Sequence, residues 1–504
     1  MASTQTPLDP AACYQALLSR DARFDGHFFT AVRTTGIYCR PVCKVRAPLA
    51  KNCLFFASAA RAEGAGFRPC LRCRPELAPA APTTMAHWST QDASQILALQ
   101  AMQLLDSAEA LADAPLSIAD LAARLGVSER HMRRILAQHL GVTPSQYRQT
   151  RRLLMAKQLL CDTALPIAGI ALLSGFASQR RFNTAFVDHY GLTPTVCRRK
   201  GQAASDVCLK LAYRPPYDAT AMMKFLAQRS VPGLELCTIG EESTGEDSSG
   251  EFVRILRMSA GKQSHLVWVR VQFEAAAHRV QVQLSDSLLP VLPAVLQQLR
   301  WALDLDADPL AIETALARDF AHCAGWRVPG AWDGFELAVR AVLGQQVTVA
   351  AARTLTTRLV QTLGEPLATP WPHLTHAFPT PATVLQATPD ELGQLGIVRQ
   401  RQKAIQAMAH AVLHGGLNLK PGPQVQATVQ ALMALPGIGE WTAQYIAMRA
   451  LRWPDAFPAG DIVVQQRLGV RDGPQPARAA TALASAWQPW RSYAVIRLWH
   501  GGSP

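Results

Sequence analysis

The sequence lacks the features that would place it in a membrane or outside the cell. No stretch of its 504 residues contains the ~20 consecutive apolar residues that a membrane span needs. The first residues carry neither the basic segment nor the continuous apolar segment of a secretory signal. The 11 cysteines are odd in number and scattered, which argues against a regular disulfide framework. We therefore expect a cytoplasmic protein whose cysteines are reduced or bind a metal.

Acidic residues are also in deficit. Lys and Arg number 50 against 37 Asp and Glu, which gives a net charge of +13. The first 201 residues contribute +11 of this charge. A basic excess of this size indicates a polyanionic partner. The hydrophobic fraction of 49% is typical of a globular chain, and the length predicts three to four domains at ~150 residues each.

Three polar or Pro-rich stretches predict boundaries and loops. Residues 76–88 are rich in Pro, Ala and Thr, and residues 198–206 end a basic helical region. Both are typical of exposed linkers. The stretch from Gly240 to Gly250 is too short for a linker and too polar for a strand, so it predicts a hairpin loop.

Four cysteines have the spacing of a metal site. Three residues lie between Cys39 and Cys43, two lie between Cys70 and Cys73, and 26 residues separate the pairs. Each short pair can present two sulfurs to one ion, as in a tetrahedral zinc-thiolate site. A chance cluster is the alternative. Cys13 and Cys53 lie outside the spacing and are expected to be ordinary buried thiols.

Basic residues crowd this segment, at a density expected where phosphates approach: Arg33, Arg40, Lys44, Arg46, Arg68, Arg72 and Arg74. The local sequence AVRTTGIYCRPVCKVRA, followed by GFRPCLRCRPE, resembles the amino-terminal domain of Ada-type methylphosphotriester repair proteins. The resemblance implies a Zn²⁺ site formed by all four cysteines. It also implies that Cys39 accepts a methyl group from an alkylated DNA phosphate. Loss of one thiolate charge would then raise DNA affinity.

The next segment contains a repeated motif. SIADLAARLGVSERHMRRILAQHLGVTP has helical spacing, with Gly126 in a turn and Ser128 as a helix cap. PIAGIALLSGFASQRRFNTAFVDHYGLTP repeats this plan 50 residues later, with Gly175 in the turn. The residues between them, SQYRQTRRLLMAKQLL, predict a long connecting helix.

This repeat resembles the AraC-type DNA-binding domain, in which the second helix of each unit lies in the major groove. The candidates for base contact stand at the front of these second helices. They are Arg130, His131, Arg133 and Arg134 in the first unit, and Gln179, Arg180, Arg181 and Asn183 in the second. The alternative is that they form a solvated helix face.

A small α+β unit is expected to follow. LKLAYRPPYDATAMMKFLAQRSVPGLE begins as a strand and continues as a helix, and FVRILRMS, HLVWVRVQF and HRVQVQL alternate as strands do. This part resembles the amino-terminal domain of AlkA-type DNA glycosylases and by itself suggests no catalysis.

From Pro309 onward the pattern is almost wholly helical, and LPGIG interrupts it between two helices. This turn could bind a DNA phosphate at a helix start. Its residues are Pro436, Gly437, Ile438 and Gly439, of which all but the proline have a backbone N–H group to donate. An ordinary helix–helix turn is the alternative. Asp461 follows 22 residues after Gly439. The combination resembles the helix-hairpin-helix glycosylases and implies that Asp461 is the catalytic carboxylate. Asp461 could also be a helix N-cap, and both roles can hold together.

Aromatic residues point to the substrate class. Trp441 and Tyr445 are four residues apart on one helix face, and Trp499 lies near the end of the sequence. The resemblance to AlkA-type enzymes implies that these three residues correspond to aromatic residues of the base pocket. Electron-rich rings stack on a cationic alkylated purine and favour its charge. A plain aromatic core is the alternative, and we expect it for Trp487 and Trp490.

Two absences narrow the chemistry further. Relatives that cleave the DNA strand carry a Schiff-base lysine in this part of the hairpin, where this chain has Trp441, so lyase activity is disfavoured. No cysteine follows Cys323, which excludes the iron–sulfur cluster of some relatives. Near Gln345 and Gln346 some relatives place an apolar wedge that fills the gap left by the flipped base. The identity of the wedge is left open here.

The sequence thus predicts a mainly α, multidomain chain. The expected domains are a small α+β zinc domain (1–80), an AraC-type double helix-turn-helix (85–200), an AlkA-like α+β domain (206–300) and an all-α helix-hairpin-helix glycosylase domain (301–504). We expect a monofunctional 3-methyladenine-type DNA glycosylase that flips its base, fused to a methylphosphotriester-sensing transcription activator. The alternative is a pure regulator whose glycosylase domain only binds DNA. The expected partners are double-stranded DNA and RNA polymerase, with no membrane, and the expected state is a nucleoid-associated monomer.

Overall fold

The computed structural model describes residues 9–80, 93–106, 117–200, 208–239, 250–260, 263–285, 291–422 and 424–500. Residues 81–88, residues 201–206 and residues 240–249 of the predicted hairpin loop lie outside these ranges. The chain divides into two compact units. The first contains residues 1–215, 278–297 and 305–308, and the second contains residues 216–277, 298–304 and 309–504. None of the helices in the described ranges has the length and apolar composition that a membrane crossing needs.

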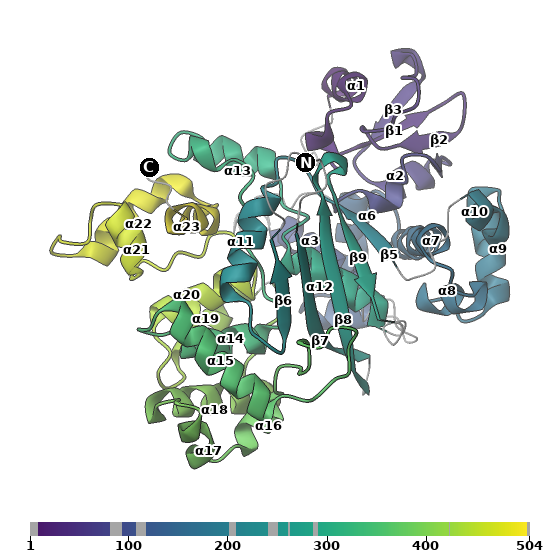
Figure 1. The fold of residues 1–504 in the computed structure, drawn as a ribbon. Helices are drawn as coiled ribbons and strands as arrows, with labels where there is room; N and C mark the ends of the chain where they lie inside the picture. Colours follow the sequence, from purple (N-terminus) through teal and green to yellow (C-terminus); the bar gives the residue numbers. More distant parts are fainter. Residues whose placement is uncertain are drawn as a thin grey trace. The chain divides into compact units, whose positions relative to one another are not determined.

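The first unit begins with a small α+β fold (Figure 1). A four-stranded sheet has the order β3-β1-β2-β4, and β2 pairs with β4 in parallel. A core of aromatic and small residues, including Phe29, Ala31, Tyr38 and Ala62, holds the sheet against α2. The elements are α1 (Pro10–Ser19), β1 (Phe29–Val32), β2 (Ile37–Cys39), β3 (Cys53–Phe56), α2 (Ala59–Gly64) and β4 (Arg68–Pro69).

Helices then dominate the first unit, as the repeated motif predicts. The long connecting helix α7 is 19 residues long and begins at a capping box formed by Thr143 and Gln146. The helices are α3 (Ala93–Asp106), α5 (Ile118–Arg124), α6 (Glu129–Leu140), α7 (Pro144–Asp162), α8 (Ile167–Leu173), α9 (Gln179–Tyr190) and α10 (Pro194–Lys200). Strands β5 (Cys208–Ala212) and β9 (Arg279–Leu284) form an antiparallel ladder in the same unit.

A buried ion-pair cluster at residue 76 joins the sheet region of this unit to α7. The side chains of Glu76 and Lys157 are each 1% exposed, and their Oε2 and Nζ atoms are 2.5 Å apart. Arg74 Nε lies 2.9 Å from Glu76 Oε1, and Arg74 Nη1 lies 2.6 Å from Asp162 Oδ1. Burial alone would raise the pKa of Glu76, but Lys157 and Arg74 outweigh it and lower that pKa. The prediction that the exposed linker begins at residue 76 is therefore wrong: residues 75–77 form a short helical turn inside the fold.

The second unit contains the antiparallel strands β6 (Glu235–Thr238), β7 (Glu251–Ala260) and β8 (Gln263–Glu274), with α11 (Ala219–Arg229). Strand β6 was not among the predicted strands. Glu235 of β6 is opposite Arg254 of β7, and Arg254 Nη1 lies 2.6 Å from Glu235 Oε1. Arg254 Nη2 also lies 2.7 Å from Glu336 Oε2 on α14 (Gly334–Leu343). This buried charge cluster fixes α14 on the strands.

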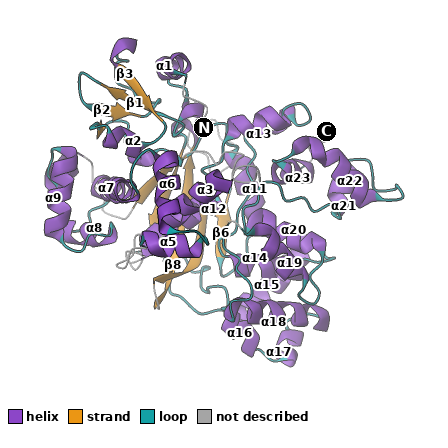
Figure 2. Cartoon of the chain, turned by 180° about the vertical axis from the view of Figure 1, so that it is seen from behind, coloured by secondary structure: helices purple, strands orange, loops and turns teal. Residues whose placement is uncertain are grey.

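The rest of the second unit is helical, as the pattern after Pro309 predicts; Figure 2 shows helices and loops in this part of the chain. Helices α19 and α20 lie side by side and form the hairpin around LPGIG. The helices are α13 (Pro309–Leu316), α15 (Val349–Leu363), α16 (Pro381–Gln386), α17 (Pro389–Gln394), α18 (Arg399–Leu413), α19 (Val425–Met433), α20 (Glu440–Arg449), α21 (Ile462–Arg467), α22 (Pro476–Ala484) and α23 (Arg491–Trp499). Helix α12 (Leu292–Ala302) begins in the first unit and ends in the second.

The buried pair between Glu76 and Lys157 leads to a stability prediction. We expect Glu76→Gln to destabilise the first unit by about 3–5 kcal/mol, because it leaves the Lys157 charge buried without its carboxylate. Hydrogen exchange measured by mass spectrometry on the full chain should show faster exchange in peptides of α7, with peptides of α20 unchanged.

The matched control is Glu129→Gln. Glu129 pairs with Arg133 on the surface, where both side chains are largely exposed. Its loss should change stability by at most about 1 kcal/mol. Equal exchange of α7 in the Glu76 variant and the wild type would contradict the assigned role of the buried pair.

Candidate functional site

The four cysteines of the predicted metal site converge in the first unit. The Sγ atoms of Cys39, Cys43, Cys70 and Cys73 all lie within 4.8 Å of one another. Cys39, Cys43 and Cys70 are buried, and Cys73 is partly exposed. No other group of three or more potential ligand side chains is found among the described residues.

Strand pairing explains why the cysteine pairs meet. Cys39 ends β2, and Cys70 directly follows β4, which runs parallel to β2. The Cys70 amide donates a hydrogen bond to the Tyr38 carbonyl at 2.9 Å. The two cysteines therefore lie at the same end of the parallel strand pair. Cys43 lies close to them because the chain turns tightly after Cys39: the Cys43 amide donates a hydrogen bond to the Arg40 carbonyl at 3.2 Å.

The residues fit a zinc ion. Four sulfurs around Zn²⁺ at ~2.3 Å form a tetrahedron whose edges are shorter than the observed limit of 4.8 Å. The Arg40 amide donates a hydrogen bond to Cys73 Sγ at 3.3 Å, which stabilises negative charge on that sulfur. Four clustered thiols without a cation would compete for protons: hydrogen bonding to Cys43 and Cys70 raises the pKa of Cys39 far above its usual range.

Two of the basic residues predicted to face phosphates do not do so. Arg40 is buried and its Nε lies 2.9 Å from Asp25 Oδ1. Arg74 is held by Glu76 and Asp162. Including these two arginines was therefore wrong, because each one neutralises a buried carboxylate. Of the seven basic residues named in the sequence, five are exposed: Arg33, Lys44, Arg46, Arg68 and Arg72.

The helix-turn-helix repeat has the same caps in both copies. Ser128 and Ser178 accept a hydrogen bond from the amide three residues later at the start of α6 and α9. Gly141 and Gly191 end these helices with positive φ angles of 67° and 64°. The sequence spacing of 50 residues is therefore reproduced as two equivalent helix pairs, α5–α6 and α8–α9, with α7 between them.

The predicted reading residues lie at the exposed starts of α6 and α9. Arg130, Arg133 and Arg134 are exposed, as are Gln179, Arg180 and Arg181, whereas His131 and Asn183 are half-buried. Arg133 pairs with Glu129, four residues earlier, so its charge is partly neutralised. The sequence motif did not show this pairing.

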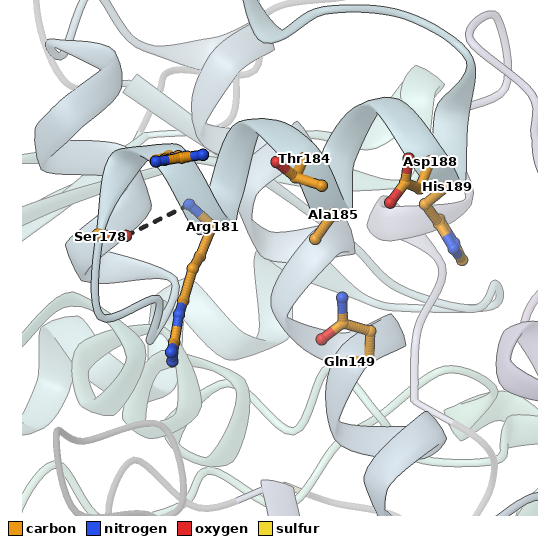
Figure 3. Close-up of a pocket in the computed structure, with 8 residues that line it drawn as sticks. Gln149, Ser178, Arg181, Thr184, Ala185, Asp188 and His189 are labelled. Atoms are coloured by element: carbon orange, nitrogen blue, oxygen red, sulfur yellow. Dashed lines mark hydrogen bonds between the residues drawn. The ribbon is translucent and has the colours of Figure 1, made fainter.

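A hollow of about 680 Å³ runs along α9. Figure 3 shows Arg181, Thr184 and Asp188 on α9 and Gln149 on the neighbouring α7. Ser178 Oγ accepts the Arg181 amide at 3.3 Å. Polar side chains of α7 and α9 line this hollow beside the start of α9.

The LPGIG hairpin is exposed at Pro436, Gly437 and Gly439, but the Ile438 side chain is buried. Ile438 can therefore contact DNA only through its backbone. Gly437 has a φ of +78°, which glycine adopts without strain, and Gly439 is the N-cap of α20. The Gly437 carbonyl accepts a hydrogen bond from Gln345 Nε2 at 3.0 Å.

The loop before α15 lies against this hairpin. Gln345 Nε2 also donates to Thr442 Oγ1 at 3.0 Å, so its side chain is fixed. Gln346 is exposed and has a φ of +53°, which is unusual for a residue other than glycine. The structure thus distinguishes two glutamines that are neighbours in sequence: the Gln345 side chain is anchored, whereas Gln346 is exposed.

Asp461 lies at the centre of an aromatic cluster in the second unit. Its side chain is 9% exposed, and it is the N-cap of α21, where Oδ1 accepts the Val464 amide at 3.0 Å. Trp441 Nε1 donates to Oδ2 at 2.8 Å, and Trp499 Nε1 donates to Oδ1 at 3.2 Å. Three donors therefore hold the carboxylate in one orientation.

The predicted pocket aromatics lie together beside this carboxylate, with Trp441 stacked on Tyr445 and Trp499 tilted by 41° against Tyr445. The Trp441 and Tyr445 rings are 5.3 Å apart with an interplanar angle of 12°, and the Tyr445 and Trp499 rings are 6.0 Å apart. All three remain partly exposed. Trp487 and Trp490 are buried at 3% and 7% exposure, as expected for core residues.

Three neighbours of this stack were not predicted. Arg449 Nη1 donates to Tyr445 Oη at 2.5 Å, and the Arg449 guanidinium lies over the ring of Phe225 on α11. Arg229, also on α11, lies over the same ring. The α+β part of the chain therefore supplies side chains to the aromatic cluster. Spacing could not show this, because Phe225 and Arg229 belong to an ordinary helix far from α20 in sequence.

Four family models match the chain in succession. They are "Metal binding domain of Ada" (residues 12–76), "Helix-turn-helix domain" (121–200), "AlkA N-terminal domain" (208–333) and "HhH-GPD superfamily base excision DNA repair protein" (339–489). Among solved structures, a 3-methyladenine DNA glycosylase of Archaeoglobus fulgidus is 18% identical, with a TM-score of 0.46, and covers 58% of this chain and 97% of that one.

Curated relatives resemble either the whole chain or one part of it. A Mycobacterium tuberculosis protein named "Probable bifunctional transcriptional activator/DNA repair enzyme AlkA" is 37% identical over 97% of this chain and 95% of its own length. DNA-3-methyladenine glycosylase 2 of Escherichia coli is 34% identical over 58% of this chain and 96% of its own length. The Escherichia coli enzyme Ada is 32% identical over 38% of this chain and 49% of its own length. The chain therefore belongs to the family of bifunctional proteins that join an Ada-like regulatory region, with its zinc and DNA-binding domains, to an AlkA-like DNA glycosylase.

Proposed function

We propose that the second unit hydrolyses the N-glycosidic bond of alkylated bases of the 3-methyladenine type after the base has been flipped out of the duplex. The observation that carries this proposal is the Asp461 carboxylate, held by two indole N–H groups and a backbone amide beside the rings of Trp441, Tyr445 and Trp499. A cationic base can stack on these rings, which favour its charge. A carboxylate fixed in this way can stabilise an oxocarbenium-like sugar.

In the proposed reaction the bond between C1′ and the base nitrogen breaks, and its electron pair stays on the base. Positive charge develops on the sugar, where the Asp461 carboxylate stabilises it. Water then adds to C1′, and its proton leaves to the carboxylate or to solvent. A cationic alkylated purine departs as a neutral molecule. No lysine takes part, because Trp441 occupies the hairpin position of the Schiff-base residue, so the product is an intact abasic site.

DNA is held near this pocket by the hairpin and the loop before α15. The exposed backbone at Gly437 and Gly439 supplies donors for a phosphate. Gln346 is the proposed wedge, because it is exposed and has a positive φ of +53°, while Gln345 is anchored. A glutamine wedge would fill the gap left by the flipped base with a polar side chain.

We further propose that the first unit is a methylphosphotriester sensor and transcription activator. Cys39, Cys43, Cys70 and Cys73 would hold Zn²⁺, which keeps sulfur deprotonated at neutral pH. Cys39 would accept the methyl group: its sulfur forms the new S–CH₃ bond, and the phosphate oxygen leaves with the electron pair of the O–CH₃ bond. The helices α6 and α9 would read an operator, and RNA polymerase would be the partner in activation. We expect the working form to be a monomer built of the four predicted segments.

Asp461→Asn tests the glycosylase assignment. Asparagine still caps α21, so the fold should persist, but the negative charge is lost. We expect single-turnover release of 7-methylguanine or 3-methyladenine to fall by about 100-fold or more. Asp472→Asn, which changes an exposed aspartate, serves as the control and should release base at the wild-type rate. Equal release by wild type and Asp461→Asn would overturn the assignment in favour of a regulator that only binds DNA.

The acceptor role of Cys39 is tested by mapping the methyl group. After incubation with DNA that carries methylphosphotriesters, mass spectrometry of proteolytic peptides should show one added methyl group, on the peptide that contains Cys39. Cys53→Ser, a change outside the four-thiol cluster, should be methylated to the same extent. Methyl found on Cys43, Cys70 or Cys73 instead would assign the acceptor elsewhere, and no methyl at all would disprove the sensor.

The reading role of α9 is tested by Arg181→Ala. The full chain is first used to select its preferred sequence from random DNA. We expect the variant to bind that sequence with a loss of about 1–3 kcal/mol and to discriminate less at one position. Arg318→Ala removes the same charge from a side chain that is 92% exposed in the second unit, and should bind like the wild type. A uniform loss over all sequences would make Arg181 a phosphate contact.

A further inference from the structure

The four-cysteine segment, residues 9–80, contacts the C-terminal ends of both candidate reading helices. Arg61 of α2 donates from Nη2 to the His139 carbonyl, in the last turn of α6, at 2.9 Å. Arg68 of β4 donates from Nη1 to the carbonyl of Tyr190, the last residue of α9, at 3.2 Å. One segment of the first unit therefore binds the same end of the corresponding helix in both copies of the repeat.

Both contacts lie against glycines at equivalent positions of the repeat. Gly141 and Gly191 follow α6 and α9 with positive φ angles. A Cβ at Gly141 would lie 2.6 Å from Arg61 Nε. A Cβ at Gly191 would lie 2.7 Å from Arg68 Nη1, so a side chain at either position would displace the guanidinium. Because the last carbonyls of a helix have no partner within it and carry partial negative charge, each arginine stabilises a helix end.

A buried glutamate strengthens this attachment. The Glu63 side chain on α2 is 2% exposed, and its Oε1 accepts a hydrogen bond from Tyr38 Oη of β2 at 2.7 Å. Its Oε2 accepts a hydrogen bond from Thr150 Oγ1 on α7 and lies 2.9 Å from His189 Nε2 on α9. Figure 3 shows His189 near the C-terminal end of α9. Glu63 thus joins the four-cysteine segment to the connecting helix and to a reading helix at once.

These contacts restrict how α6 and α9 can move relative to each other. Without them, the link between the two helices would run through α7, which residues 141–143 join to α6 and residues 163–166 join to α8. Each of these joints allows rotation. A second connection, from the end of α6 through the four-cysteine segment to the end of α9, removes that freedom. The restriction matters for reading DNA, because two helices on one duplex must enter the major groove about one helical turn apart, roughly 34 Å.

We propose that the four-cysteine segment braces the two reading helices: Arg61 and Arg68 hold the ends of α6 and α9 and thereby set the separation of the two DNA elements that the chain recognises. The inference rests on the proposed reading role of α6 and α9. Arg61 and Arg68 are positioning residues, since they act through the helices and not on bases. The ligand that fits the braced form is a duplex whose two elements have one fixed separation.

The experiment measures how strongly binding depends on that separation. The full chain is used to select its preferred sequence from random DNA, and footprinting locates the two elements. Dissociation constants are then measured with and without one base pair inserted between the elements, and their quotient is the insertion ratio. The variants are Arg61→Met and Arg68→Met, singly and together, and the same positions changed to Lys. Methionine keeps an unbranched stem without a donor, whereas lysine keeps the charge and a donor. Arg20→Met, on an exposed side chain after α1, is the control for the loss of one charge.

We expect an insertion ratio of about 100 for the wild type, because one base pair turns one element by roughly 35° and a helix then loses its base contacts. The double methionine variant should lower the ratio to about 10 or less, since its helices can adjust to the new separation. Each single methionine variant should lower it by a smaller factor. The double lysine variant should recover most of the wild-type ratio, and Arg20→Met should leave it unchanged.

The outcomes separate the brace from the reading role on which it rests. If the wild type selects no preferred sequence, the proposed reading role fails. If it selects one but the methionine variants keep the wild-type insertion ratio, the reading role stands and the brace is overturned. Weaker binding by the same factor with and without the insertion would make Arg61 and Arg68 phosphate contacts and also overturn the brace. If the double variant binds no duplex, the two single variants decide in the same way.

Discussion

A buried charge needs an opposite charge, and this requirement joins distant segments within each unit. In the first unit Glu76 holds Lys157, so the segment that carries Cys70 and Cys73 is fixed to the long helix α7 between the two helix-turn-helix pairs. In the second unit Arg254 holds Glu235 and Glu336, so strands β6 and β7 are fixed to α14. In both places desolvation would be prohibitive for one partner alone, which makes the pairing a condition for the fold.

The aromatic cluster of the second unit is the exception to this rule. Arg229 and Arg449 keep their charges beside Phe225 with no anion opposite them among the described residues. Only ring faces, backbone carbonyls and the Tyr445 oxygen compensate them. The ion-pair clusters thus join distant segments of the fold, whereas the two arginines beside Phe225 are held by ring faces, backbone carbonyls and a phenol oxygen.

The features that the sequence predicts well are those that depend on short spacing. Each cysteine pair, each helix-turn-helix unit and the cap at Asp461 depend on residues that are close together in sequence, where local geometry decides the outcome. The features it misses join residues far apart. Glu76 reads as part of a Pro- and Ala-rich linker, and only Lys157, 81 residues later, shows that it is buried. Arg229 is missed for the same reason, because nothing near it in sequence marks its approach to the rings around Asp461.

The difference between contacts that are close in sequence and contacts that are distant also changes how the net charge of the protein is interpreted. A formal count treats all basic residues of the first segment alike, yet Arg40 and Arg74 neutralise buried carboxylates and offer no charge to a polyanion. Screening confines the remaining exposed charges to about 10 Å at moderate salt, so a DNA backbone senses local charge rather than the sum of +13. Loss of a single thiolate charge at Cys39 is small against the total. The same loss of one charge is large compared with the charge of the few exposed cations around the four cysteines. One methyl group can therefore alter DNA affinity in the proposed sensor.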